Sequence, residues 1–428
     1  MMTKNMFIRI ALPLMLLIAS SANAQLKIEI TTQSGKQFPI AVVPFGNENT
    51  LSQSVSQTIG ADLARSGLFR LVETGGILPI PTEPSEIKYP DWRARSADGI
   101  VVGSVRALGN NQVEVRFRLM DAVKQTQLAG VAITAPASQV RTTAHKIADM
   151  IYEAITGDKG VFATRIAYIA KQGRRYELQV ADADGFNPQT VLASNEPLMS
   201  PAWSPDGTQL AYVSFENKRP TVVVQNLSAG TRRTVANFRG NNSAPTWSRD
   251  GRSLVVALSK DAISQLYTVS ANGGEATRIT NSSGIDTEPT FSPDGKWIAF
   301  VSDRGGSPQI YRVSATGGEA QRLTFNGGYN VSPDWSGDGK SIAFIQRDAG
   351  KFRAALLEVA TGQIEVLTDS SLDENPSFAP NGRMILYATQ VGGRGVLATV
   401  SSDGRVKSRL TPNSGDVREP AWGPFLKN

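Results

Sequence analysis

The chain contains no cysteine and only one histidine among its 428 residues. The absence of thiols excludes disulfide bonds, thiolate metal sites and a cysteine nucleophile. The single histidine, His145, has no second histidine or cysteine with which to share a metal ion, so we interpret it as an ordinary residue of a helix. The sequence also has no G-x-S-x-G nucleophile elbow and no phosphate-binding glycine loop between a strand and a helix. We therefore expect no catalytic site, no cofactor and no metal.

The sequence has a single long apolar run and little excess of either charge. Two basic residues precede the apolar run Ile10 to Ala19, and Ala22-Asn23-Ala24 follows it. This order is typical of a secretory signal peptide, residues 1–24, with cleavage expected between Ala24 and Gln25. The run is too short to span a bilayer, and we expect a soluble, exported chain without membrane insertion.

The charge that remains after cleavage is small. Loss of the two leader residues leaves 42 basic residues against 38 acidic ones, so the formal net charge falls from +6 to +4. No block of basic residues stands out along the chain. The sequence therefore gives little support for nucleic-acid binding.

A box of the form Pro-x-Trp/Phe-Ser-Pro-Asp-Gly recurs six times. Its aromatic residues are Trp203, Trp247, Phe291, Trp335, Phe378 and Trp422, at intervals of 44, 44, 44, 43 and 44 residues. In the third complete unit, strands are expected at 289–292, 297–302, 309–313 and 319–324. A period of about 40–45 residues with four short strands is typical of a β-propeller blade.

The boxes are offset from the strands that follow them. Six copies of the second strand run from residue 166 to residue 387, whereas the six boxes run from residue 203 to residue 422. The first of these strands has no box before it, and the last box has no strand after it. We therefore predict a six-bladed propeller over residues 161–428, in which residues 419–423 close the ring as the innermost strand of the first blade.

The repeated aspartates of the box have a structural interpretation. Asp206, Asp250, Asp294 and Asp338 each precede a turn glycine, where the side chain can bond its own backbone. Asp182-x-Asp184-Gly185 resembles the start of a calcium loop but lacks a glutamate at the twelfth position, so we interpret it as a blade turn. The box aromatics are expected to pack between blades and to bind no ligand.

Residues 25–156 lack the period and predict a small α/β domain with helices on a mixed sheet. Expected strands are 27–31, 38–45, 69–73, 99–103, 113–119 and 127–134. Helices are expected at 51–65 and 138–156, a loop at 77–90, and a short hinge to the propeller at 157–160.

Function is expected on the surface of the propeller. The loops that enter the first strand of each blade, and those that join the second strand to the third, should share one rim of the central channel. Their sequences are polar and varied, as is typical of a recognition surface. The candidate residues are Ser200, Asn241, Asn242, Ser243, Ala244, Thr287, Glu288, Ser332, Glu374 and Arg418.

The whole chain resembles the TolB family, periplasmic components of the Tol-Pal system. The resemblance is carried by Arg-Ile-Ala-Tyr at 165–168, Pro-Leu-Met-Ser-Pro-Ala-Trp-Ser-Pro-Asp-Gly at 197–207 and Leu-Asp-Glu at 372–374. These stretches occur together with a leader and an α/β domain. The resemblance implies a non-enzymatic adaptor in the periplasm that supports outer-membrane integrity and constriction at cell division.

The resemblance also implies two partner sites. The lipoprotein Pal would bind the channel mouth through the rim residues named above. The inner-membrane protein TolA would bind residues 25–36, and other envelope proteins are further expected partners. Within that segment the expected contacts are Gln25, Leu26, Lys27, Ile28, Glu29, Ile30 and Thr31.

Two alternative functions remain. One is an exported propeller enzyme, a lyase or a glycan hydrolase, that acts in the channel. It would need carboxylates that converge on the axis, and the sequence shows none at equivalent blade positions. The other is a passive glycan- or peptide-binding module.

Overall fold

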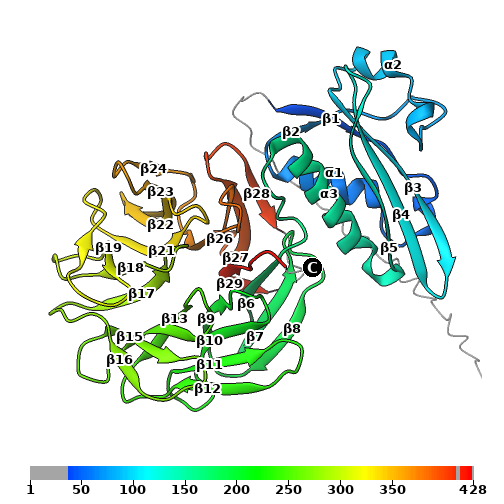
Figure 1. Ribbon diagram of the computed structural model, residues 1–428. Coiled ribbons are helices and arrows are strands. Elements are labelled where there is room, and N and C mark those ends of the chain that lie inside the picture. Colours follow the sequence, from blue (N-terminus) through cyan, green and yellow to red (C-terminus); the bar gives the residue numbers. More distant parts are fainter. Residues whose placement is uncertain (1–36, 411–414, 427–428) are drawn as a thin grey trace, which may run out of the picture.

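The computed structural model describes residues 37–410 and 415–426, and it shows an N-terminal α/β domain beside a six-bladed β-propeller (Figure 1). The N-terminal domain contains a five-stranded sheet of order β2-β1-β3-β4-β5, in which β1 is parallel to β2 and β3 and the other pairs are antiparallel. Its strands are β1 (Phe38–Val42), β2 (Phe69–Leu71), β3 (Gly99–Gly109), β4 (Gln112–Asp121) and β5 (Gln127–Pro136). The strand predicted at 27–31 lies outside the described residues.

Two helices, α1 (Val55–Arg65) and α3 (Val140–Thr156), cover one face of this sheet. Apolar residues recur at helical spacing in α1, where Val55, Ile59 and Leu63 are fully buried. Burying each such side chain stabilises the fold by roughly 1.5–3 kcal/mol. The helix predicted from residue 51 begins later because the Ser54 side chain accepts the N–H of Gln57 and caps it there.

The segment 77–90 was predicted as a loop, and this prediction was wrong in part. It includes the short 3-10 helix η2 (Pro84–Glu86) and the start of α2 (Tyr89–Ala94). Proline in the first turn of a helix removes an N–H that has no intrahelical partner, so Pro90 begins a helix rather than breaking one. Trp92 is fully buried and packs on the second face of the sheet. Two further 3-10 turns are η1 (Glu48–Thr50) and η3 (Ala137–Gln139).

The propeller consists of six four-stranded antiparallel blades. The first blade contains β6 (Arg165–Gln172), β7 (Arg175–Asp182) and β8 (Gln189–Ser194), and is completed by β29 (Asp416–Trp422). The second blade contains β9 (Leu198–Trp203), β10 (Gln209–Ser214), β11 (Thr221–Asn226) and β12 (Arg232–Ala236), and the third contains β13 (Asn242–Trp247), β14 (Ser253–Leu258), β15 (Gln265–Ser270) and β16 (Ala276–Arg278). The fourth contains β17 (Asp286–Phe291), β18 (Trp297–Ser302), β19 (Gln309–Ser314) and β20 (Gln321–Arg322), and the fifth contains β21 (Asn330–Trp335), β22 (Ser341–Asp348), β23 (Lys351–Glu358) and β24 (Ile364–Val366). The sixth contains β25 (Glu374–Phe378), β26 (Met384–Val391), β27 (Arg394–Ser401) and β28 (Lys407–Leu410).

The predicted closure of the ring is confirmed. Strand β29 pairs antiparallel with β6, and Trp422 lies opposite Ile166 in this ladder. The Trp422 indole is largely buried and donates to the Thr164 hydroxyl at 2.8 Å. The C-terminal strand therefore joins the two ends of the propeller in one sheet, which we call the closing blade.

The roles predicted for the repeated box are also seen. The carboxylates of Asp206, Asp250, Asp294 and Asp338 each accept the backbone N–H two residues further on. The Trp203 indole donates to the Ala421 carbonyl and the Trp247 indole to the Ala202 carbonyl, both at 3.1 Å. These bonds join neighbouring blades. No helix among the described residues has the length and apolarity needed to cross a bilayer.

The N-terminal domain meets the closing blade at a buried charged cluster. His145, interpreted above as an ordinary helical residue, is 1% exposed and lies between Asp62 of α1 and Asp184 of the turn between β7 and β8. The earlier interpretation was incomplete because these partners are distant in the sequence.

Candidate functional site

The six residues that precede the box prolines share a left-handed backbone, and we call them the channel ring. They are Ser200 (φ 51°), Ala244 (φ 48°), Glu288 (φ 51°), Ser332 (φ 54°), Asn375 (φ 48°) and Glu419 (φ 50°). In every blade the ladder between the first and second strands shifts register at this point. The bulge accommodates a proline that has no N–H for the ladder. Each such conformation costs of order 1–3 kcal/mol, and residues of this kind cluster at functional sites.

Two members of the channel ring carry carboxylates. Glu288 accepts the backbone N–H of Ser332 at 2.6 Å, and Glu419 accepts the backbone N–H of Ser200. In both cases the donor is the ring residue of the next blade. Because the two glutamates are three blades apart in a ring of six, they lie on opposite sides of the channel. The statement that no carboxylates occupy equivalent blade positions was therefore wrong.

The pKa of each of these carboxyl groups is raised above its ordinary value. Burial raises the pKa of Glu419 to about 7, although the Ser200 N–H acts in the opposite direction. Burial likewise raises the pKa of Glu288. Ionised carboxylates are disfavoured in a low-dielectric wall unless hydrogen bonds compensate. The mouth of the channel therefore becomes more negative as the pH rises.

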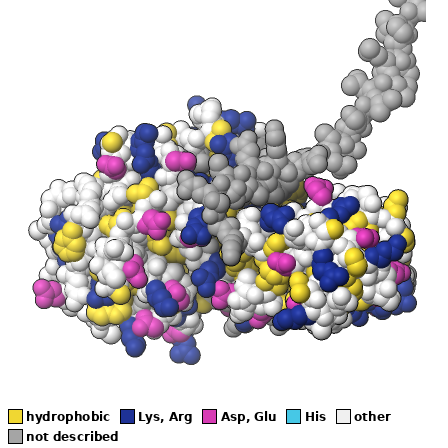
Figure 2. All heavy atoms as spheres, turned by 90° about the horizontal axis from the view of Figure 1, so that it is seen from above, with side chains coloured by type: hydrophobic (Ala, Val, Ile, Leu, Met, Phe, Trp, Pro, Cys, Tyr) yellow, Lys and Arg dark blue, Asp and Glu magenta, His cyan; other side chains and the backbone are white. Residues whose placement is uncertain are grey.

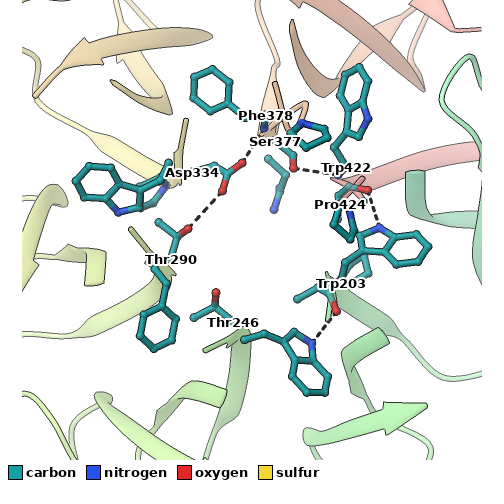
Figure 3. A pocket seen from close by; sticks show the side chains of 18 of the residues that line it. Trp203, Thr246, Thr290, Asp334, Ser377, Phe378, Trp422 and Pro424 are labelled. Carbon is teal, nitrogen blue, oxygen red and sulfur yellow. Dashed lines mark hydrogen bonds between the residues drawn. The ribbon is translucent and has the colours of Figure 1, made fainter. Parts of the chain in front are cut away.

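Below the ring, the channel encloses a cavity of about 660 Å³ (Figure 3). Asp334 points into this cavity and accepts the Phe378 N–H at 2.7 Å and the Thr290 hydroxyl at 3.3 Å. Burial raises its pKa to about 6. The side chains of Phe378, Trp203 and Trp422 point away from the axis, toward the gaps between blades.

Three carboxylates of the channel connect neighbouring blades. Glu288, Glu419 and Asp334 each accept a backbone N–H from the following blade, so each carboxylate holds two blades together.

The two loop sets predicted to share a rim do meet there. The Ile285 N–H donates to the Asp303 carboxylate at 2.6 Å, and Arg304 pairs with Asp286 at 2.8 Å. The first contact joins an entry loop to a loop between second and third strands. The two kinds of loop are therefore in direct contact in this blade.

The predicted site residues occupy different parts of this surface. Ser200, Ala244, Glu288 and Ser332 belong to the channel ring and line its cavity. Glu374 and Arg418 stand one position before the ring members Asn375 and Glu419, which the prediction missed. Burial raises the pKa of Glu374, and the nearby Arg418 charge partly offsets this. The signal that would have found both missed residues is their place directly before a box proline.

The loop before β13 contains both surface and structural residues. Asn241 is exposed and donates to the Ser243 hydroxyl at 2.7 Å. Asn242 is fully buried, and its amide accepts the Phe238 N–H at 2.8 Å and donates to the Phe238 carbonyl at 2.9 Å. Asn242 therefore holds the loop in shape and is no contact residue. Thr287 is half-buried in β17.

Exposed apolar side chains lie on or beside the entry loops and the loops between second and third strands, and the sequence did not point to them. They are Met199 (40% exposed), Ile263 (40%), Ile285 (51%), Phe325 (71%) and Leu372 (46%). Apolar residues among polar neighbours are typical of a protein-binding surface. On the face shown in Figure 2, by contrast, basic and acidic side chains are interspersed over both domains.

Comparisons with known proteins agree with this two-domain architecture. Residues 152–426 match the family described as TolB beta propeller domain, and residues 26–128 match TolB amino-terminal domain. The Tol-Pal system protein TolB of Thiobacillus denitrificans is 67% identical over 405 residues, which cover 94% of this chain and 95% of the relative. The protein of the same name from Methylobacillus flagellatus is 61% identical over 409 residues, with 95% and 94% covered. The crystal structure of TolB from Acinetobacter baumannii has a TM-score of 0.86 and 42% identity, covering 94% of this chain and 100% of that chain.

Proposed function

Because the chain belongs to the TolB family of Tol-Pal system proteins, we propose that it is a non-enzymatic adaptor of the periplasm. In this proposal it binds the lipoprotein Pal at the rim of the propeller channel and the inner-membrane protein TolA through residues 25–36. The link supports outer-membrane integrity and constriction at cell division. The observations that carry the Pal site are the left-handed channel ring and the five exposed apolar side chains on or beside the loops at that end of the blades.

The rim fits a protein partner for physical reasons. Exposed apolar residues such as Phe325 and Ile285 can be buried by a partner, which supplies affinity. Four of the six ring members are paired across a blade boundary, Glu288 with Ser332 and Glu419 with Ser200, which limits the conformational entropy lost on binding. Ser200, Ala244, Thr287, Glu288 and Ser332 are the proposed contacts at the centre. Asn241, Ser243, Glu374 and Arg418 are proposed contacts further out.

The TolA site is proposed from the family and from the leader. Cleavage between Ala24 and Gln25 would place Gln25, Leu26, Lys27, Ile28, Glu29, Ile30 and Thr31 at the start of the mature chain, and these residues lie outside the described structure. The alternation of Lys27 to Thr31 suits pairing with an exposed strand of a partner. The proposed hinge at 157–160 connects the domain that carries the TolA segment to the propeller that carries the Pal site. Through this connection, binding at one site would change the affinity of the other.

Calorimetric titration with the soluble domains of Pal and TolA tests both sites. Deletion of residues 25–36 is expected to abolish TolA binding and to leave Pal binding unchanged or stronger. Thr287→Arg is expected to weaken Pal binding and to leave TolA binding intact. Ala229→Arg, in the exposed turn between β11 and β12, is the matched control. Unchanged TolA affinity after the deletion, or equal effects of the two arginine variants on Pal, would reject the respective site.

The enzyme alternative has no observation in its favour. The three channel carboxylates already accept backbone N–H groups, and the relatives carry the name of a Tol-Pal system protein. A passive glycan- or peptide-binding module would bind neither Pal nor TolA in the titrations above. The same experiment therefore separates the adaptor from that alternative.

A further inference from the structure

Six ionisable residues meet where the N-terminal domain contacts the closing blade, and we call them the junction cluster. They are Asp62 and Arg65 of α1, Arg141 and His145 of α3, and Asp182 and Asp184 at the turn between β7 and β8. The proposed partner sites use none of them. Asp62, His145 and Asp184 are almost fully buried, with 1%, 1% and 4% exposure. Buried charges are costly unless they are paired, so their arrangement requires a physical reason.

His145 lies between carboxylates of the two domains. Its Nδ1 is 2.5 Å from Oδ2 of Asp62, in the same domain. Its Nε2 is 3.7 Å from Oδ2 of Asp184, in the propeller, and has no hydrogen-bond partner. An imidazolium donates from both nitrogens, whereas neutral imidazole donates from only one. Only the protonated ring is therefore attracted to both domains at once.

Arginines satisfy the other sides of the two carboxylates. Arg65 pairs with Asp62 at 3.0 Å and also donates to the Ala183 carbonyl across the junction at 2.6 Å. Arg141 pairs with Asp184 and stacks on the Phe186 ring, with 3.9 Å between the guanidinium carbon and the ring centroid. Asp62, His145 and Asp184 are close enough to share a metal ion. Because the two guanidinium groups already supply the positive charge, we assign none of the three as a metal ligand.

We propose that protonated His145 is a pH-dependent tie between the N-terminal domain and the closing blade. Loss of its proton leaves a nitrogen lone pair that faces the Asp184 carboxylate. The attraction between His145 and Asp184 is then lost. The remaining contacts of Arg65 and Arg141 keep the domains connected but less firmly oriented. The tie sets how rigidly the two ends of the molecule are held relative to each other.

The charges around His145 favour the protonated ring. Burial alone would lower its pKa, but Asp62 and Asp184 outweigh burial and the opposing charge of Arg141, so the pKa of His145 is raised above 6.5. Asp182 and Asp149 also face the group, and each adds negative charge when it is ionised. A raised pKa in the folded state means that the tie is complete at acid pH and is lost as the pH rises through that value.

Asp149 responds to pH in the same region of the structure. Its carboxylate accepts the N–H groups of Phe162 at 2.7 Å and Ala163 at 3.1 Å, in the segment that joins the domains. Burial raises its pKa to about 7. An effect of pH on the junction must therefore be assigned to His145 with variants and not from the pH profile alone.

The single histidine allows a direct measurement. One imidazole Cε1–H signal in the NMR spectrum of the full chain reports the titration of His145 without competing signals. We expect a pKa above 6.5, lowered by about one unit or more in Asp184→Asn. Asp369→Asn, at an exposed carboxylate elsewhere, is the matched control and should leave the pKa unchanged. A pKa below 6.5, or one that does not respond to Asp184→Asn, would overturn the proposal.

The orientation of the domains provides the second measurement. Because the chain has no cysteine, Val123→Cys and Ala229→Cys introduce two spin labels, one in each domain, without background. We expect a narrow distance distribution below the measured His145 pKa and a broader one above it. His145→Gln, which cannot be protonated, should be broad at both pH values. If that variant fails to fold, Asp184→Asn takes its place with the same expectation. A distribution that ignores pH, or a pH response retained in either variant, would overturn the proposal.

Discussion

Glu419, in the last strand of the chain, accepts the backbone N–H of Ser200 across the seam where the ring closes. Glu288 makes the same contact with Ser332 half a turn around the channel. At these two positions a carboxylate that precedes a box proline thus holds the left-handed residue of the following blade. Ser200 is held in this way only when the ring is closed.

Removal of the closing strand should unfold the propeller. A chain that ends after Gly415 loses all of β29 and with it the ladder to β6 and the buried Trp422. About four ladder bonds at roughly 1 kcal/mol each and an indole at roughly 2–3 kcal/mol approach the stability of a typical domain. Circular dichroism should show no cooperative melting of the propeller. A chain that ends after Leu426 is the control, and equal melting of the two chains would contradict ring closure.

Glu419→Gln should change how stability depends on pH. The pKa of Glu419 in the folded protein is about 7, above its ordinary value of 4.5. The group therefore contributes stability at acid pH that is lost as the pH rises from about 4.5 to about 7. The variant should be more stable than the parent at pH 8 by roughly 1–3 kcal/mol and similar at pH 4. Urea unfolding at both pH values measures this, with Glu319→Gln, at an exposed turn, as control. A variant that loses stability at pH 8 would refute the prediction.

Two adjacent asparagines should respond differently to alanine. Asn242→Ala removes a buried amide and both of its hydrogen bonds to the half-buried Phe238 backbone, which costs about 1–3 kcal/mol. Asn241→Ala removes an exposed side chain and should cost less than about 0.5 kcal/mol. Chemical denaturation of the two variants compares these values. Equal losses of stability would mean that the hydrogen bonds between Asn242 and the Phe238 backbone contribute little to the free energy of unfolding.

Phe325 should be an important contact if the rim binds Pal. Its ring is 71% exposed, and burial of an aromatic residue by a partner commonly dominates an interface. Phe325→Ser should weaken Pal binding by about tenfold or more in calorimetry, while the melting temperature stays unchanged. Val366→Ser, at an exposed site on β24 in the outermost strand of its blade, is the control. Loss of affinity in both variants would point to a general surface effect.

The sequence predicted the propeller well because its signals are local and repeated. The turn Pro293-Asp294-Gly295 and the strand Trp297–Ser302 need only neighbouring residues to be recognised, and the strand was predicted with the bounds that the structure shows. The α/β domain was predicted less well. Pro90 was interpreted as part of a loop, although proline suits the first turn of a helix equally, and only the burial of Trp92 decides between the two.

The candidate site was predicted in outline. The loops that enter the first strand of each blade were predicted as the binding surface, yet Glu374 and Arg418 were chosen where Asn375 and Glu419 occupy the ring. Neighbouring residues of a strand place their side chains on opposite faces of the sheet, and a bulge changes this alternation. The sequence shows the proline but not the bulge. The exposure of Phe325 and the burial of Asn242 likewise depend on neighbours that are distant in the chain.

The sequence by itself determined the number of blades, the turns and the strand that closes the ring, because each is encoded in short segments that repeat. Only the tertiary structure decided which side chains face the channel and which are buried at the domain junction. His145 and Asp62 are separated by 83 residues, and Asp184 belongs to the other domain. Contacts of this kind arise from packing and the orientation of the domains, and no local pattern specifies them.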